Sequence, residues 1–276
     1  MNSGIAGRLY VVGTPIGNIR DITFRAVEIL KSSDLIACED TRHTRILLDK
    51  YEIRTPTTSY HKFNTKTKTA FIINKIKEGK TVALVSDAGM PGISDPGREL
   101  VKAAAQENIS IEVIPGASAL ISAISVSGLK ADRFAFEGFP PVKPSARKEF
   151  FRKLANEERT TVIYEAPHRI LSTLAELKEH FGDRNMCAAR ELTKKFEEVA
   201  RGRISELIKK FSRTKPRGEF VLIIEGEKAA EKVSVDPEIL VNDLVEAGVP
   251  KSSAVKIVAN RLKVPKNLLY RKTLSD

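Results

Sequence analysis

The sequence has few of the residues that metal sites and disulfide frameworks require. Its two cysteines, Cys38 and Cys187, show neither a C-x-x-C spacing nor histidines at ligand spacing. This pattern argues against a zinc site and against disulfide bonds, and it fits a reducing compartment. We therefore predict no metal among the site residues.

Long apolar runs are also absent. No stretch approaches the roughly 18 apolar residues of a membrane-spanning helix. Residues 1–7 lack the basic flank and apolar run of a signal peptide. We expect a cytoplasmic protein without a membrane partner.

Acidic residues are in the minority. The 46 lysines and arginines against 35 aspartates and glutamates leave a net charge of +11, which favours a polyanionic partner. The alternative is a solvated basic surface, so the distribution of the charge matters. Residues 251–272 contain no acidic residue and seven basic ones: Lys251, Lys256, Arg261, Lys263, Lys266, Arg271 and Lys272.

The first part of the chain alternates strand-like and helix-like patterns. Runs typical of buried strands lie at residues 9–12, 35–38, 81–85 and 111–114. The clearest helical patterns between them cover residues 21–31 and 96–107. This βαβ alternation predicts an α/β domain over residues 1–128, with a parallel sheet whose carboxyl edge carries the ligand loops.

After Gly128 the strand-like runs come closer together, at residues 134–136, 160–164, 186–189, 196–200 and 220–224. They predict a mixed α+β domain over residues 129–232 that closes the cleft. The segment 140–148 (PPVKPSARK) is rich in proline and basic residues and is expected to be an exposed loop.

The pattern of capping and basic residues over 233–276 predicts a small basic helical tail. Asp236 is a typical N-cap before Pro237, and Gly248 a typical C-cap. Further helices are expected over about residues 252–263 and from residue 265 to the end. The pattern is similar to a helix-turn-helix, and the alternative is a plain helical tail packed on the body.

Three turn-rich segments follow the predicted strands: 13–18 (GTPIGN), 86–97 (SDAGMPGISDPG) and 115–119 (PGASA). Glycines there allow close approach of backbone to a ligand, and prolines fix the loop shape. The missing G-x-G-x-x-G and G-K-[ST] patterns argue against a nucleotide polyphosphate. For residues 13–18 alone, a tight turn is the alternative. Asp87 suits a ligand role, whereas Asp95 is expected to cap the following helix.

These three segments, in this order, resemble the tetrapyrrole methylase superfamily of S-adenosylmethionine enzymes. The resemblance implies a two-domain α/β fold with S-adenosyl-L-methionine held between the domains. Carried over position by position, it implies cofactor contacts from Pro15, Asp87, Gly89, Ile93, Ala117, Ser118, Tyr164, Ala189 and Phe220.

Four further motifs resemble the ribosomal RNA branch of that superfamily: 136–140 (FEGFP), 164–169 (YEAPHR), 189–194 (ARELTK) and 218–221 (GEFV). This resemblance implies a homodimer that methylates the ribose 2'-oxygen of a decoding-centre cytidine in 16S rRNA, within the small ribosomal subunit. A methylase of a tetrapyrrole or a diphthamide precursor is the alternative. A Rossmann oxidoreductase and a non-enzymatic RNA-binding factor are more distant alternatives.

A ribose hydroxyl is a poor nucleophile, so a nearby group should accept its proton or stabilise the oxyanion. The candidates are Glu165, His168, Arg190, Glu191 and Lys194. We predict Glu165 as the base, with Arg190 and Lys194 as its catalytic partners. His168 also suits a structural cap, and the spacing of Glu191 and Lys194 suits a helical ion pair.

Overall fold

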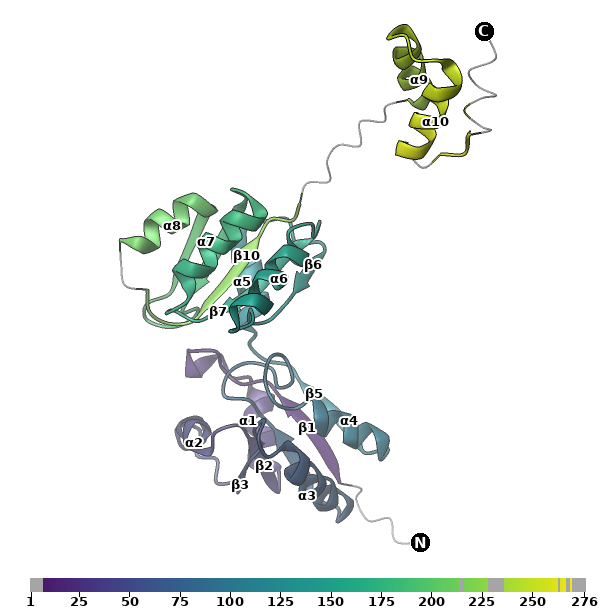
Figure 1. Ribbon diagram of the computed structural model, residues 1–276. Helices are drawn as coiled ribbons and strands as arrows, with labels where there is room; N and C mark the ends of the chain where they lie inside the picture. The colour runs from purple at the N-terminus through teal and green to yellow at the C-terminus, as the bar shows by residue number, and fades with distance from the viewer. Residues whose placement is uncertain (1–6, 214–215, 228–235, 263, 267–268, 270–276) are drawn as a thin grey trace. The chain divides into compact units, whose positions relative to one another are not determined.

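The computed structural model describes residues 7–213, 216–227, 236–262, 264–266 and 269. The chain forms two compact units, Met1–Glu227 and Lys228–Asp276, and the first contains two sheets (Figure 1). No helix in the described part is long and apolar enough to cross a membrane.

The first sheet is entirely parallel, as the alternation predicts. Its strands, in the order β3-β2-β4-β1-β5, are β1 (Arg8–Val12), β2 (Leu35–Cys38), β3 (Thr57–Ser59), β4 (Thr81–Leu84) and β5 (Ser110–Ile114). One face packs on α1 (Phe24–Ser32) and α2 (Thr41–Lys50). The other packs on α3 (Thr65–Lys77) and α4 (Arg98–Gln106). All strands therefore deliver their following loops to one edge.

The starts of α1 and α4 differ in how they are capped. Thr23 caps α1 by accepting a hydrogen bond from the Ala26 amide at 3.1 Å, while residues 19–21 form a separate 3₁₀ turn. The N-cap of α4 is Gly97, which has a φ of 148° and no side chain that could cap. The expectation that Asp95 caps this helix is therefore wrong.

The second sheet is mixed, again as predicted. Its order is β6-β7-β10-β8-β9, built from β6 (Phe134–Phe136), β7 (Thr160–Glu165), β8 (Asn185–Arg190), β9 (Glu198–Arg203) and β10 (Phe220–Ile224). Only β6 and β7 pair in parallel. The strand predicted at residues 196–200 begins at Glu198, because two turn hydrogen bonds fold the preceding residues back.

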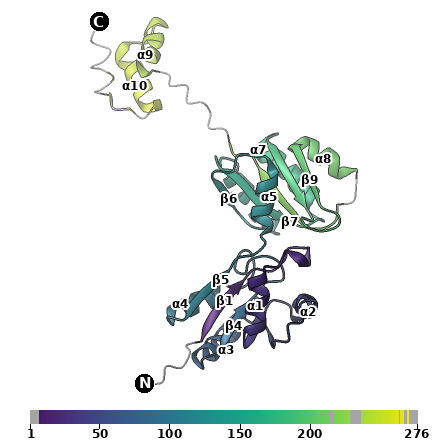
Figure 2. The same ribbon diagram turned by 180° about the vertical axis from the view of Figure 1, so that it is seen from behind.

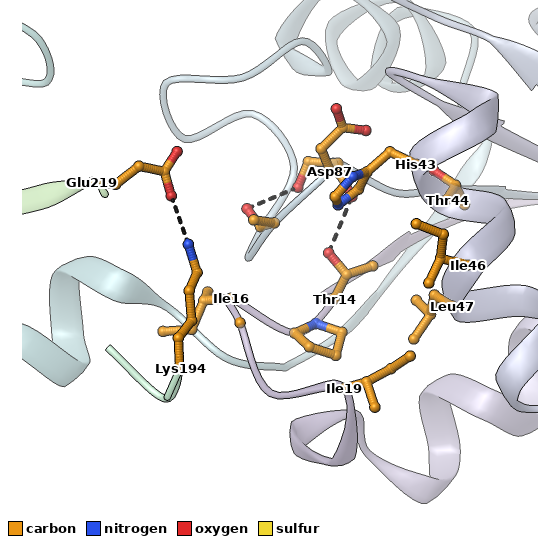
Figure 3. Close-up of a pocket in the computed structure, with 14 residues that line it drawn as sticks. Thr14, Ile16, Ile19, His43, Thr44, Ile46, Leu47, Asp87, Lys194 and Glu219 are labelled. Atoms are coloured by element: carbon orange, nitrogen blue, oxygen red, sulfur yellow. Dashed lines mark hydrogen bonds and ion pairs between the residues drawn. The ribbon is translucent and has the colours of Figure 1, made fainter. Parts of the chain in front are cut away.

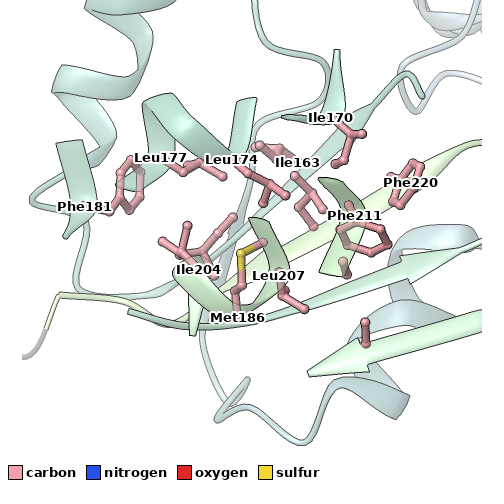
Figure 4. Close-up of a cluster of buried hydrophobic side chains, with 14 of the residues drawn as sticks. Ile163, Ile170, Leu174, Leu177, Phe181, Met186, Ile204, Leu207, Phe211 and Phe220 are labelled. Carbon is pink, nitrogen blue, oxygen red and sulfur yellow. The ribbon is translucent and has the colours of Figure 1, made fainter. Parts of the chain in front are cut away.

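Helices cover both faces of the second sheet. The face in Figure 4 packs on α6 (Pro144–Leu154), α7 (Ile170–Phe181) and α8 (Ile204–Ser212). The opposite face packs on α5 (Ala119–Ser127), seen in Figure 2. Helix α5 belongs to residues 1–128, which were predicted as the first domain, yet it packs on the second sheet. The division into domains at residue 128 therefore stays a prediction.

The segment 140–148 differs from the exposed loop expected there. Pro144 begins α6, where proline's fixed φ suits the first turn. Arg147 is buried, and its guanidinium donates to Glu176 and Thr173. Burial of a charged side chain is tolerated here because both partners satisfy it.

The three loops at the edge of the first sheet are held by backbone contacts. Thr14 and Gly89 exchange two backbone hydrogen bonds, of 2.9 and 3.1 Å. The Gly13 and Gly116 backbones touch, since a Cβ on Gly116 would lie 2.9 Å from three Gly13 atoms. The loops after β1, β4 and β5 thus form one interlocked structure, which we call the loop cluster.

The second unit contains α9 (Pro237–Glu246) and α10 (Lys251–Leu262), whose buried residues form a small separate core. Asp236 caps α9 by accepting from the Glu238 amide, and Gly248 has a φ of 87°. The N-cap prediction is confirmed, whereas the C-cap is Ala247 and Gly248 is the left-handed residue that follows it. The helix expected from residue 265 onward lies mostly outside the described residues.

Substitution of Gly116 tests the loop cluster. Gly116→Ala should lower the free energy of unfolding by about 2 kcal/mol, because the added methyl group meets backbone that cannot move aside. Thermal denaturation measures the effect. Gly128→Ala is the control: that glycine is left-handed, with a φ of 73°, and its Cβ position has no neighbour closer than 3.9 Å, so it should lose only about 1 kcal/mol. An equal loss in both variants would contradict close packing at Gly116.

Candidate functional site

Two adjoining pockets lie beside the loop cluster. The narrow pocket, of about 210 Å³, is lined mainly by residues 86–97, the start of α5 and the ends of β7 and β10. The wide pocket, of about 570 Å³, is lined mainly by residues 14–19, α2 and residues 86–88 (Figure 3). They share Ile16, Asp87, Ala88 and Glu219.

The structure brings most of the predicted cofactor residues together. Six of the nine line the narrow pocket: Asp87, Gly89, Ile93, Ser118, Tyr164 and Phe220. Pro15 lines the wide pocket. Ala189 lines a third cavity, of about 40 Å³, which Glu219 also lines. Ala117 belongs to the loop cluster but lines none of these three pockets.

Asp87 is held at the wall between the two pockets. One of its carboxylate oxygens accepts from the Asp40 amide at 3.1 Å, which ties the loop after β4 to the start of α2. Ser86 beside it donates to the Gly89 carbonyl and accepts, through its own carbonyl, from Thr14. The loop cluster therefore fixes Asp87 from both sides.

The narrow pocket carries an excess of negative charge. Burial raises the pKa of Asp95 to about 6, with further contributions from the charges of Glu39, Asp87 and Glu219. Burial and the charge of Asp87 also raise the pKa of Glu39. Carboxylates whose ionisation is opposed in this way favour a positively charged ligand.

An aromatic wall closes the narrow pocket on the second-sheet side. The rings of Phe139 and Tyr164 meet edge to face, with centroids 5.4 Å apart. Phe136 packs on the same tyrosine at 4.9 Å. The pocket thus offers apolar surface beside its carboxylates, a lining typical of small-molecule sites.

Lys194 projects into the wide pocket from a strained turn. Its ammonium group lies 2.8 Å from Glu191 and 3.4 Å from Glu219. Burial alone would lower the pKa of Lys194, but the two carboxylates raise it above its ordinary value. Glu191 and Thr193 have φ of 50° and 66°, and strain of this kind often marks functional sites.

The same turn is attached to the loop cluster. Thr193 accepts from the Asn18 amide at 2.9 Å. A Cβ on Gly17 would lie 2.5 Å from the Lys194 side chain, so only glycine permits this approach. Lys194 is therefore positioned by residues from both sheets, and the ion pair with Glu191 is part of a turn rather than a helix.

Glu165 does not reach the pockets. Its side chain is fully buried, and it accepts from the Ala166 amide, Arg169 and Thr173. Arg169 also donates to the Pro140 carbonyl, so Glu165 braces the segment that carries Phe139. With both oxygens occupied, it is positioned to support the aromatic wall instead of accepting a substrate proton.

The other catalytic candidates lie apart. Arg190 forms an ion pair with Glu198 at 2.8 Å and lines none of the three pockets. Its Nε is buried without a hydrogen-bond partner among the described residues. His168 also lines none of these pockets. Glu191 lines the 40 Å³ cavity and accepts a hydrogen bond from the Lys194 ammonium group.

Sequence reasoning missed His43 and Glu219 in the wide pocket. Glu219 lies inside the 218–221 motif, so it could have been found there. For His43 the available signal was the polar stretch 39–43 directly after β2, at the edge where a parallel sheet binds ligands.

Comparisons with known proteins agree with this fold and these loops. The family model described as Tetrapyrrole (Corrin/Porphyrin) Methylases matches residues 8–208. A protein of Synechocystis sp., named ribosomal RNA small subunit methyltransferase I, is 47% identical over 97% of this chain and 98% of its own length. A Thermotoga maritima protein of that name is 47% identical over 80% of this chain and 100% of its own.

Among solved structures, the chain resembles uroporphyrin-III C-methyltransferase from Thermus thermophilus, complexed with S-adenyl homocysteine. The TM-score is 0.57 at 19% identity, over 79% of this chain and 97% of that one. This likeness shows the fold, and the sequence relatives show the family. The chain belongs to the tetrapyrrole methylase family and, within it, to the ribosomal RNA small subunit methyltransferase I family.

Proposed function

We propose that this chain is an S-adenosylmethionine-dependent enzyme that, as a homodimer, methylates 16S ribosomal RNA at the 2'-oxygen of a decoding-centre cytidine. The observation that carries the proposal is the pair of adjoining pockets, one small and acidic and the other large enough for a nucleotide. The relatives' names support ribosomal RNA as the acceptor. The nucleotide and the atom rest on the motif resemblance.

The chemistry of the narrow pocket fits S-adenosylmethionine. This group supplies, when bound, a methyl activated by a positive sulfonium. Asp95 and its neighbouring carboxylates favour a cation, as the raised pKa of Asp95 indicates. Ile93 offers an apolar face to an adenine ring, whereas the Phe220 ring packs on Phe211 in the core of the second sheet and can reach this pocket only through its backbone. We propose as contacts the six predicted residues that line this pocket: Asp87, Gly89, Ile93, Ser118, Tyr164 and Phe220.

Lys194 suits stabilisation of charge on the acceptor oxygen. Its pKa is raised by Glu191 and Glu219, so it stays protonated and cannot serve as the base. A fixed ammonium group lowers the energy of a developing oxyanion. We assign Glu165 and Arg190 positioning roles, because neither lines a pocket.

The second unit suits a polyanion. Helix α10 carries Lys256 and Arg261 on its exposed side and contains no acidic residue. Lysine and arginine are the usual groups that contact phosphates. We propose that this unit binds RNA and adds affinity without forming part of the cofactor site.

The acceptor can be identified with methyl-labelled S-adenosylmethionine. We expect label in small-subunit ribosomal RNA or in small ribosomal subunits, in a dinucleotide that resists alkaline hydrolysis, because a methylated 2'-oxygen cannot attack its phosphate. A chain ending at Glu227 should keep its affinity for S-adenosylmethionine and lose at least about tenfold in RNA labelling. Label in an added tetrapyrrole alone would overturn the RNA assignment.

The affinity for S-adenosylmethionine should depend on pH through Asp95. Below a pKa of about 6 the carboxyl group is protonated, so binding of a cation must first expel that proton. The apparent affinity, measured by calorimetry, should fall about tenfold between pH 7 and pH 5. Asp95→Asn should bind weakly at both pH values. A wild-type affinity that is constant from pH 5 to 7 would contradict this role.

Substitutions of Lys194 and of Glu165 should affect different properties, turnover in the first case and stability in the second. Lys194→Met should lower turnover about 100-fold with little change in cofactor affinity, because only the charge on the acceptor oxygen loses its partner. Glu165→Gln should lower the free energy of unfolding by about 3 kcal/mol and spare turnover per folded molecule, because it breaks a buried ion pair. Steady-state kinetics and thermal denaturation separate them. Loss of turnover in a fully folded Glu165→Gln would restore Glu165 as the base.

A further inference from the structure

The wide pocket adjoins the narrow pocket, in which we propose that the methyl donor binds. It shares Ile16, Asp87, Ala88 and Glu219 with the narrow pocket, so the two cavities meet along one wall. A donor in the narrow pocket can therefore face an acceptor in the wide one. Transfer of a group requires this direct approach.

The lining of the wide pocket matches a nucleoside. One side is apolar and comes from Ile19, Ile46 and Leu47, which suits the face of a base. His43 comes from the same helix as Ile46 and Leu47, and Lys194 lies across the pocket from it; these two side chains suit hydroxyl and phosphate oxygens. At about 570 Å³ the cavity lies within the range of roughly 300–1,000 Å³ that small-molecule sites occupy.

Four titratable side chains line this pocket: His43, Asp87, Lys194 and Glu219. Asp87 already accepts from the Asp40 amide, and Glu219 faces the ammonium group of Lys194. The charged groups nearest to His43 on its own helix are also paired, Asp40 with Arg42 and Arg45 with Asp49. Of these four, His43 alone has a side chain that forms no hydrogen bond or ion pair with a described residue, which makes it our candidate to take the proton.

The His43 side chain is exposed, and no hydrogen bond to a described residue occupies its imidazole. His43 lies in the first turn of α2. Asp40 caps this helix, because its carboxylate accepts a hydrogen bond from the Arg42 amide at 2.8 Å. That helix is anchored to Asp87 through the Asp40 amide. The imidazole thus stands on a rigid element that is tied to Asp87, one of the residues shared by the two pockets.

We propose that the wide pocket receives the acceptor nucleotide, turned out of its RNA strand, and that His43 accepts the proton of its ribose 2'-hydroxyl. This inference rests on the proposed function. As the 2'-oxygen bonds to the methyl carbon, the carbon–sulfur bond breaks and its electron pair stays on sulfur. The hydroxyl proton passes to the imidazole, which later releases it to solvent, and Lys194 stabilises charge on the oxygen.

Substitution of His43 tests the proton transfer. His43→Gln should lower turnover on small-subunit RNA at least about 100-fold, the usual worth of a general base. Its affinity for S-adenosylmethionine should stay within about twofold. At saturating S-adenosylmethionine, where the loss of affinity through Asp95 does not limit the rate, the wild-type rate should fall on the acid side of its pH profile, and that limb should vanish in the variant. Added imidazole should partly restore His43→Ala. His180→Ala, a histidine on α7 outside the three pockets, is the matched control.

Occupancy of the wide pocket has a readout that needs no turnover. Without S-adenosylmethionine, small-subunit RNA should slow the reaction of diethyl pyrocarbonate with His43 and leave His180 unaffected, as mass spectrometry would measure. Ile46→Trp, which narrows the pocket, should raise the KM for RNA at least tenfold. Leu171→Trp, on the exposed side of α7, should not change it.

The outcomes separate this inference from the proposed function. RNA methylation by the wild type, together with unchanged turnover and acid limb in His43→Gln, would overturn the role of His43 alone. Equal modification of His43 with and without RNA would overturn the nucleotide pocket. A wild-type protein that binds S-adenosylmethionine but labels no RNA would contradict the proposed function itself, and this inference with it.

Discussion

The site depends on one close approach of backbone to backbone, between Gly13 and Gly116. No side chain fits between them, and a pair of backbone hydrogen bonds joins Thr14 to Gly89. Three loops that begin on different strands therefore cannot move separately. The walls of both pockets are set by this contact, because Thr14, Asp87 and Ser118 all extend from the interlocked loops. A preorganised site of this kind avoids the entropic cost of ordering loops around a ligand.

The electrostatics of the two pockets follow from what the second sheet adds. Its turn at residues 191–194 brings a lysine to the wide pocket, and Glu219 lies in the shared wall. The narrow pocket is left with carboxylates that repel one another. A cation is thus favoured on the donor side, while a fixed ammonium group faces the acceptor side. This division of charge suits transfer of a positively charged methyl group to an oxygen.

Patterns local in sequence predicted much of this structure. Alternating β-branched runs indicated the parallel sheet, and Asp236 with Gly248 indicated the limits of α9, because capping and periodicity act over a few residues. The loops that carry Asp87 and Ser118 were found by their glycines and prolines. The prediction for Asp95 failed, and that for residues 140–148 was right about exposure at residues 142–146 and 148 but missed the start of α6 at Pro144 and the buried Arg147, which tertiary pairing decides. Glu165 lies in the motif 164–169, yet its carboxylate accepts hydrogen bonds from three donors that only the fold brings together. His43 was missed although it lies in the polar stretch 39–43 after β2, because that stretch lacks the glycines and prolines that marked the other loops.

The most direct test of this account is a crystal structure of the full chain with S-adenosylhomocysteine and a cytidine nucleotide. The account predicts that S-adenosylhomocysteine lies in the narrow pocket, in contact with Asp87 and Tyr164. It predicts the ribose in the wide pocket, with its 2'-oxygen within about 3.2 Å of the His43 imidazole. A donor bound outside the narrow pocket, or a ribose that approaches it from a side away from α2, would contradict the central claim.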